Sequence, residues 1–154
     1  MVHTHYTGTG KVHTFRGLLD SDGQDKIRIQ GPVGAIAWRI TKFEILPKNF
    51  GTADYEAVVQ VWREEQTTPT NVIDFRIDEL LAAACWSGPT NVTGEVSGTH
   101  VIFDNALFLR NIWVTLKDTQ SGKINYYIEL EEVKVSAAGM AQLSLAAARR
   151  LEEK

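Results

Sequence analysis

Apolar and polar residues alternate with a period of two along much of the chain, a pattern typical of half-buried β-strands. The clearest case is residues 124–135, whose first half alternates strictly. The alternation slips at Glu131 and Glu132, and the following apolar positions, Val133 and Val135, have the opposite parity. This slip predicts a β-bulge that returns the strand to the core side.

Other segments rich in β-branched and aromatic residues predict further strands. Residues 110–117 alternate in the same way, and the turn residues 118–123 join them to residues 124–135. These two segments therefore predict an antiparallel hairpin. The remaining predicted strands are residues 13–18, 26–30, 35–45, 54–63, 72–75 and 100–103.

Two segments predict helices. Residues 78–85 are rich in leucine and alanine, with Asp78 as an N-cap, and residues 136–154 form an alanine-rich tail. We therefore predict a mainly β fold, an antiparallel two-sheet sandwich or jelly roll with a short internal helix and a C-terminal amphipathic helix. A closed barrel is the alternative. The predicted divisions are an N-terminal arm (1–11), a β-sandwich domain (12–135) and the C-terminal helix (136–154).

Composition narrows the class of protein. The chain has 154 residues, 44% of them hydrophobic and 23% charged, as expected of one folded domain. A net charge of -3 gives no long-range attraction to nucleic acid or to an anionic membrane. Cys85 is the single cysteine, which excludes an internal disulfide and fits a reducing cytoplasm. Neither a signal-peptide pattern nor a run of ~18 apolar residues occurs, so we expect no Sec export and no membrane span.

Motifs that carry chemistry are weak. His3 and His5 could face a metal ion together, but no further ligands follow at organised spacing. The segments 20–25 and 7–11 lack the spacing of a calcium loop and of a phosphate-binding loop. We therefore predict no catalytic site, no metal site and no cofactor. An enzyme remains an alternative, because distant residues can assemble a pocket without leaving a linear motif.

Three large aromatic side chains are placed by the alternation on the nominally polar faces of their strands: Trp62, Trp113 and Tyr127. They could contact a protein partner or stack against sugar rings. Alternatively, they pack beneath a loop or a helix of the same chain.

The tail has an apolar stripe at helical spacing through Met140, Leu143, Ala147 and Leu151. So short a helix is marginal in isolation, so the stripe must dock on its own sandwich or on a neighbouring subunit. The predicted partner-binding residues are Trp62, Trp113, Tyr127, Met140, Leu143 and Leu151.

Residues 72–75, 101–105 and above all 124–131 resemble small structural proteins of tailed bacteriophages of marine type, in the same order over residues 12–135. The resemblance implies a non-enzymatic virion component, made in the host cytoplasm, that acts as a capsid decoration or cement protein. Its implied partners are the major capsid protein or other virion proteins, and it is expected to form a homo-oligomer. No nucleic acid, membrane or small-molecule ligand is expected. The alternative is a carbohydrate- or receptor-binding module of a virion.

Overall fold

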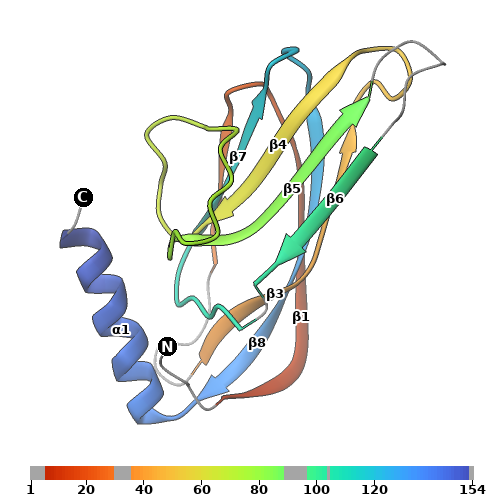
Figure 1. The fold of residues 1–154 in the computed structure, drawn as a ribbon. Helices are drawn as coiled ribbons and strands as arrows, with labels where there is room; N and C mark the ends of the chain where they lie inside the picture. Colours follow the sequence, from red (N-terminus) through yellow and green to blue (C-terminus); the bar gives the residue numbers. More distant parts are fainter. Residues whose placement is uncertain (1–5, 30–35, 89–96, 104, 153–154) are drawn as a thin grey trace.

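The computed structural model describes residues 6–29, 36–88, 97–103 and 105–152. The strands form two antiparallel sheets, one in the order β1-β8-β3 and one in the order β2-β7-β4-β5-β6 (Figure 1). The mainly β, two-sheet prediction and the C-terminal helix are therefore confirmed. The elements are β1 (Tyr6–Leu19), β2 (Gln24–Ile27), β3 (Ile36–Pro47), β4 (Tyr55–Trp62), β5 (Leu80–Gly88), β6 (Ser97–Ile102), β7 (Ile112–Asp118), β8 (Ile124–Val135) and α1 (Ala137–Glu152).

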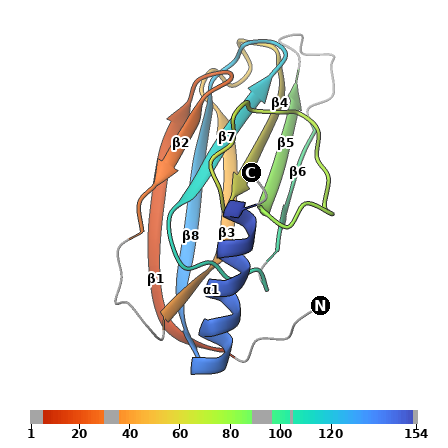
Figure 2. The same cartoon turned by 90° about the vertical axis from the view of Figure 1, so that its left-hand side faces the viewer.

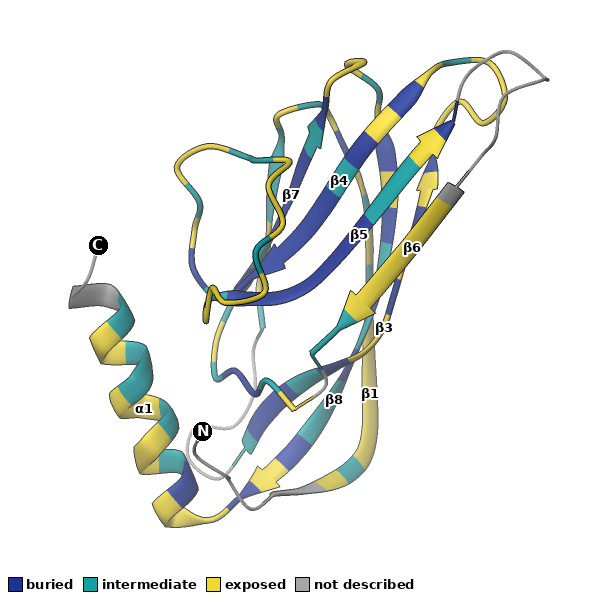
Figure 3. Cartoon of the chain, viewed as in Figure 1, coloured by how far each residue is buried: buried dark blue, intermediate teal, exposed yellow. Residues whose placement is uncertain are grey.

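The main core lies between the two sheets, which face each other in a sandwich-like arrangement (Figures 1 and 2). Phe43 and Ile128 enter it from the three-stranded sheet, and Val59 and Leu116 enter it from the five-stranded sheet. All four are fully buried. In Figure 3, β8 alternates between buried and more exposed positions, whereas the second half of β4 is buried throughout. Burial of each such side chain contributes roughly 1.5–3 kcal/mol to folding, so the alternation fixes which face of each strand points inward.

The predicted hairpin of residues 110–117 and 124–135 is wrong. β7 pairs with β2 and β4, whereas β8 pairs with β1 and β3. The turn between them crosses from one sheet to the other. The buried carboxylate of Asp118 accepts the backbone N–H groups of Gln120 and Gly122, which closes this turn without any cross-strand pairing.

The predicted internal helix over residues 78–85 is also wrong, because residues 80–85 belong to β5 and residues 78–79 form the turn before it. Ala82 and Ala84 lie opposite Val61 and Val59 in the core, and Ala83 is buried on the other face. A strand buried on both faces has no polar alternation to reveal it, and packing overrides the helix propensity of alanine. Residues 72–75, predicted as a strand, lie instead in an irregular loop.

The irregularity predicted as a bulge within β8 lies instead in the two strands that pair with β8. β8 runs without interruption, and the register shifts lie in β1, between Gly8 and Val12, and in β3, between Ile40 and Lys42. Val133 and Val135 are nevertheless buried, as the change of parity predicts. The extra residues of β1 and β3 thus accommodate the slip.

The helix α1 docks on its own chain. A second cluster of buried residues joins Ala37, Leu107, Val133 and Val135, and Met140 and Leu143 of α1 pack against it. Ser136 caps the helix, since its hydroxyl accepts the N–H of Gly139. At the other end of the chain, β1 begins at Tyr6 and therefore includes part of the predicted N-terminal arm.

Candidate functional site

The predicted aromatic residues do not form one surface. Trp62 is 2% exposed, and its indole N–H donates to the hydroxyl of Thr115 over 2.9 Å. Trp113 lies beside it in register and is half-buried, with the ammonium of Lys26 5.6 Å from its ring centre. Tyr127 lies on β8, in the other sheet. Trp62 therefore has no exposed surface for a partner, and Trp113 and Tyr127 belong to different faces.

The predicted helical contacts are mostly intramolecular. Met140 and Leu143 are half-buried against the second cluster, and Ala147 faces the small hollow between α1 and residues 107–111. The side chain of Leu151 lies outside the described residues. Among the described side chains of α1, the exposed large apolar one is Leu145, which the predicted stripe does not include.

A loop over residues 63–79 carries the exposed apolar side chains that sequence reasoning missed. This segment forms neither helix nor strand and projects beside β4 and β5 (Figures 1 and 2). Loops longer than ~12–15 residues without regular structure are uncommon in compact domains, and those that are ordered are usually functional. Its apolar side chains are all 40% exposed or more, and we call them the apolar loop surface: Val72, Ile73, Phe75 and Ile77.

Hydrogen bonds hold this loop in place. The side-chain amide of the buried Gln60 donates to the carbonyl oxygens of Thr70 and Val72, at 3.1 and 3.2 Å. The ring of Phe75 packs edge to face on Phe103, with the ring centres 5.1 Å apart. The loop is therefore fixed in shape before any partner binds, which lowers the entropy cost of binding.

A group of charged residues joins the base of this loop to α1; Arg150 and Glu64 are largely buried in it, and Asp78 lies exposed at its edge. Arg150 of α1 donates to the carboxylate of Asp78 over 2.8 Å, and its Nε lies 4.0 Å from the carboxylate of Glu64. Arg63 is enclosed beside them and donates to the carbonyl oxygens of Asp78 and Leu107. Burial, and then the charge of Arg150, lower the pKa of Arg63 to about 10, so Arg63 stays protonated at neutral pH. The helix thus braces the loop.

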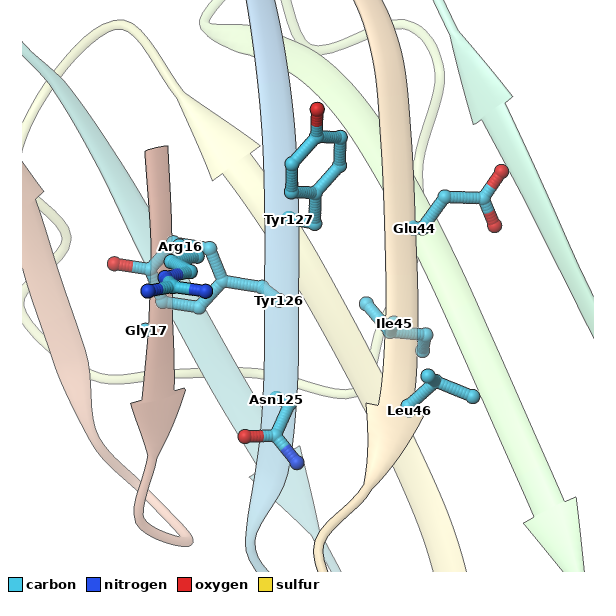
Figure 4. A pocket seen from close by; sticks show the side chains of 8 residues that line it. All are labelled: Arg16, Gly17, Glu44, Ile45, Leu46, Asn125, Tyr126 and Tyr127. Atoms are coloured by element: carbon cyan, nitrogen blue, oxygen red, sulfur yellow. The ribbon is translucent and has the colours of Figure 1, made fainter. Parts of the chain in front are cut away.

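A groove of about 530 Å³ runs along the three-stranded sheet, at the strand β8 (Figure 4). Register aligns Arg16, Tyr127 and Glu44 across the three strands. The next row two residues along is formed by Asn125, with leucines of the two neighbouring strands on either side. Figure 4 shows Tyr127 in front of β8, with Arg16 on the side of β1 and Glu44 and Leu46 on the side of β3. The groove was not predicted, because its residues are far apart in the sequence.

Two further features bear on the class of site. Among the described residues, no three histidine, cysteine or acidic side chains gather as a metal site would require. His3 and His5 lie outside those residues. Within the same ranges, no helix has the length and apolar character to span a membrane.

Comparisons with models of known protein families, with curated proteins and with solved structures find no match. We therefore infer function from the residues themselves.

Proposed function

We propose that this protein is a non-enzymatic structural protein of a tailed-phage virion, a decoration or cement protein that attaches to the outer capsid shell. The observation that carries the proposal is the apolar loop surface, four exposed apolar side chains on a loop fixed to the sheet beneath it. Large apolar side chains that stay exposed within one short, anchored loop are typical of a protein contact. The partner would be the major capsid protein.

The strand pairing supports a jelly-roll architecture, which is common among viral capsid and lectin domains. A jelly roll can be drawn as a long hairpin that pairs strands 1 and 8, 2 and 7, 3 and 6, and 4 and 5. In this chain β1 pairs with β8, β2 with β7, and β4 with β5. The departure is β6, which pairs with β5 although it also lies near β3.

Co-sedimentation tests the proposal. The purified protein is mixed with heads of the phage that encodes it, stripped of their outer proteins, and bound protein is measured against concentration. Phe75→Ser removes the largest side chain of the apolar loop surface. Phe50→Ser is the matched control, because Phe50 is 64% exposed against 55% for Phe75 and makes a comparable edge-to-face contact, with Trp86.

The unsubstituted protein and Phe50→Ser are expected to bind alike, whereas Phe75→Ser should lose roughly 30-fold in affinity, the effect of a residue central to an interface. Absence of binding to the heads, or an equal loss with both variants, would contradict the proposal.

A second candidate function is a carbohydrate-binding module of a virion. The specific observation in its favour is the groove of the three-stranded sheet, in which an aromatic ring stands between a guanidinium and a carboxylate.

A further inference from the structure

We infer that the groove along β8 is a binding site for a neutral saccharide, with Tyr127 and Asn125 at its centre. This inference narrows the second candidate function to one surface and one ligand class, and it does not depend on the capsid role. It also departs from the sequence-based expectation that the chain binds no small ligand.

The groove combines polar and apolar parts as a sugar ring requires. Leu46 lines the groove beside Asn125 in register, and it is 60% exposed. One face of a pyranose ring carries C–H groups and its rim carries hydroxyl groups. Leu46 and the ring of Tyr127 can take the C–H face, while the amide of Asn125 both donates to and accepts from hydroxyl groups.

The polar groups around the groove are available to a ligand. The side chains of Arg16, Glu44 and Asn125 make no hydrogen bond or ion pair with the part of the chain that the structure describes. This contrasts with the far end of the same sheet, where Arg39 and Glu131 are paired. A guanidinium supplies donors and a carboxylate supplies acceptors, so the two sides of the groove complement the hydroxyl groups of one sugar.

Tyr127 is held in position before any ligand arrives. Its hydroxyl donates to the carboxylate of Glu129 over 2.7 Å, and the ammonium of Lys42 lies 5.9 Å from its ring centre. The hydrogen bond to Glu129 raises the pKa of Tyr127, so the phenol stays neutral. Both contacts come from the Glu129 side, because Lys42 pairs with Glu129 in register. The side of the ring towards Asn125 stays open to the groove.

The charges around the groove favour a neutral ligand over an anionic one. Arg16 and Lys42 are positive, and Glu44 and Glu129 are negative, so the carboxylates offset the attraction of the cations for an acidic sugar or a phosphate. The volume lies in the range of ~300–1,000 Å³ that is usual for small-ligand sites. A short stretch of a neutral polysaccharide fits these properties.

The test is isothermal titration of the whole protein with cellohexaose, maltohexaose, laminarihexaose and chitohexaose at millimolar concentration, and with hexagalacturonate as the anionic comparator. The groove variants are Arg16→Ala, Asn125→Ala and Tyr127→Ala. Two control variants lie away from the groove: Arg28→Ala is matched to Arg16→Ala, and Trp86→Ala removes an aromatic ring from the other sheet. Circular dichroism melting identifies any variant that fails to fold, and Arg16→Ala and Asn125→Ala change exposed side chains only.

The inference expects at least one neutral hexasaccharide to bind, each groove variant to weaken that binding by about tenfold, and both controls to bind within about twofold of the unsubstituted protein. Binding of a neutral sugar that the groove substitutions leave unchanged would overturn the groove assignment while the second candidate function stands. Binding of no sugar would overturn both, and binding of hexagalacturonate alone would overturn the ligand class.

Discussion

Replacement of Asp118 by alanine should destabilise the fold by removing the acceptor that closes the turn between the two sheets. The carboxylate of Asp118 is buried and accepts three backbone N–H groups, from Glu56 at 3.1 Å, Gln120 at 2.8 Å and Gly122 at 3.1 Å. A hydrogen bond to a charged group contributes about 1.5–3 kcal/mol, and an unpartnered buried donor costs a similar amount.

The expected loss is smaller than the sum of three such bonds. Glu56 and Gln120 are exposed residues, so water can accept hydrogen bonds from their backbone N–H groups and partly replace the lost carboxylate. We therefore expect Asp118→Ala to lower the free energy of unfolding by about 3 kcal/mol. For a chain of this size, that corresponds to a fall of about 6–12 °C in Tm.

Urea unfolding followed by circular dichroism, together with calorimetry, measures this loss. Asp118→Asn keeps one carbonyl oxygen and should lose about half as much. Asp20→Ala is the control, because it removes an exposed carboxylate that pairs with Lys123, and such surface pairs contribute less than ~1 kcal/mol. If the free energy of unfolding of Asp118→Ala lies within about 1 kcal/mol of that of the unsubstituted protein, the turn does not depend on this carboxylate and the reasoning is refuted.

Three further substitutions test the interior. Trp62→Phe removes the hydrogen bond to Thr115 and leaves a cavity, so the free energy of unfolding measured with denaturant should fall by about 2–3 kcal/mol. Binding to phage heads should be unchanged. A binding defect without a loss of stability would contradict the burial of Trp62. Burial, and then Asp25, raise the pKa of Tyr126 above its ordinary value, so the folded protein holds the phenolic proton longer than the unfolded chain; stability should fall as the pH rises above ~10, and Tyr126→Phe should flatten that fall. Gly17→Ala places a Cβ 2.6 Å from the hydroxyl of Tyr126, so it should cost about 1–3 kcal/mol and reshape the groove, seen as a lower Tm; an unchanged Tm would show that the ring moves freely.

Strands were predicted best from the sequence where one face of the strand is buried and the other is exposed to solvent. The segment that forms β8 is the clearest example, because its alternation survives in the structure. β5 was mistaken for a helix because Ala83 and its neighbours are buried on both faces, which removes the polar half of the pattern. The partner strands of β7 and β8 were predicted wrongly because a short turn such as residues 118–123 can either join two strands of one sheet in a hairpin or connect two different sheets.

The candidate surfaces were harder to predict, for different reasons. Tyr127 was found by its parity, but Arg16 and Glu44 join it only through strand register, which a single sequence does not display. Trp62 has the same parity signal as an exposed residue, and its burial depends on the tertiary structure. The apolar loop surface could have been predicted from the length of residues 63–79, which form no helix or strand. The prediction of a strand over residues 72–75 obscured that length.

The central claim is that the protein attaches to a capsid shell through Val72, Ile73, Phe75 and Ile77. An electron cryomicroscopy reconstruction of stripped phage heads, to which the purified protein has been added back, tests it most directly. The account predicts ordered density at regular lattice positions, into which the chain fits with residues 72–77 against the shell. Heads without added density, or density in which the loop points away from the shell, would contradict it.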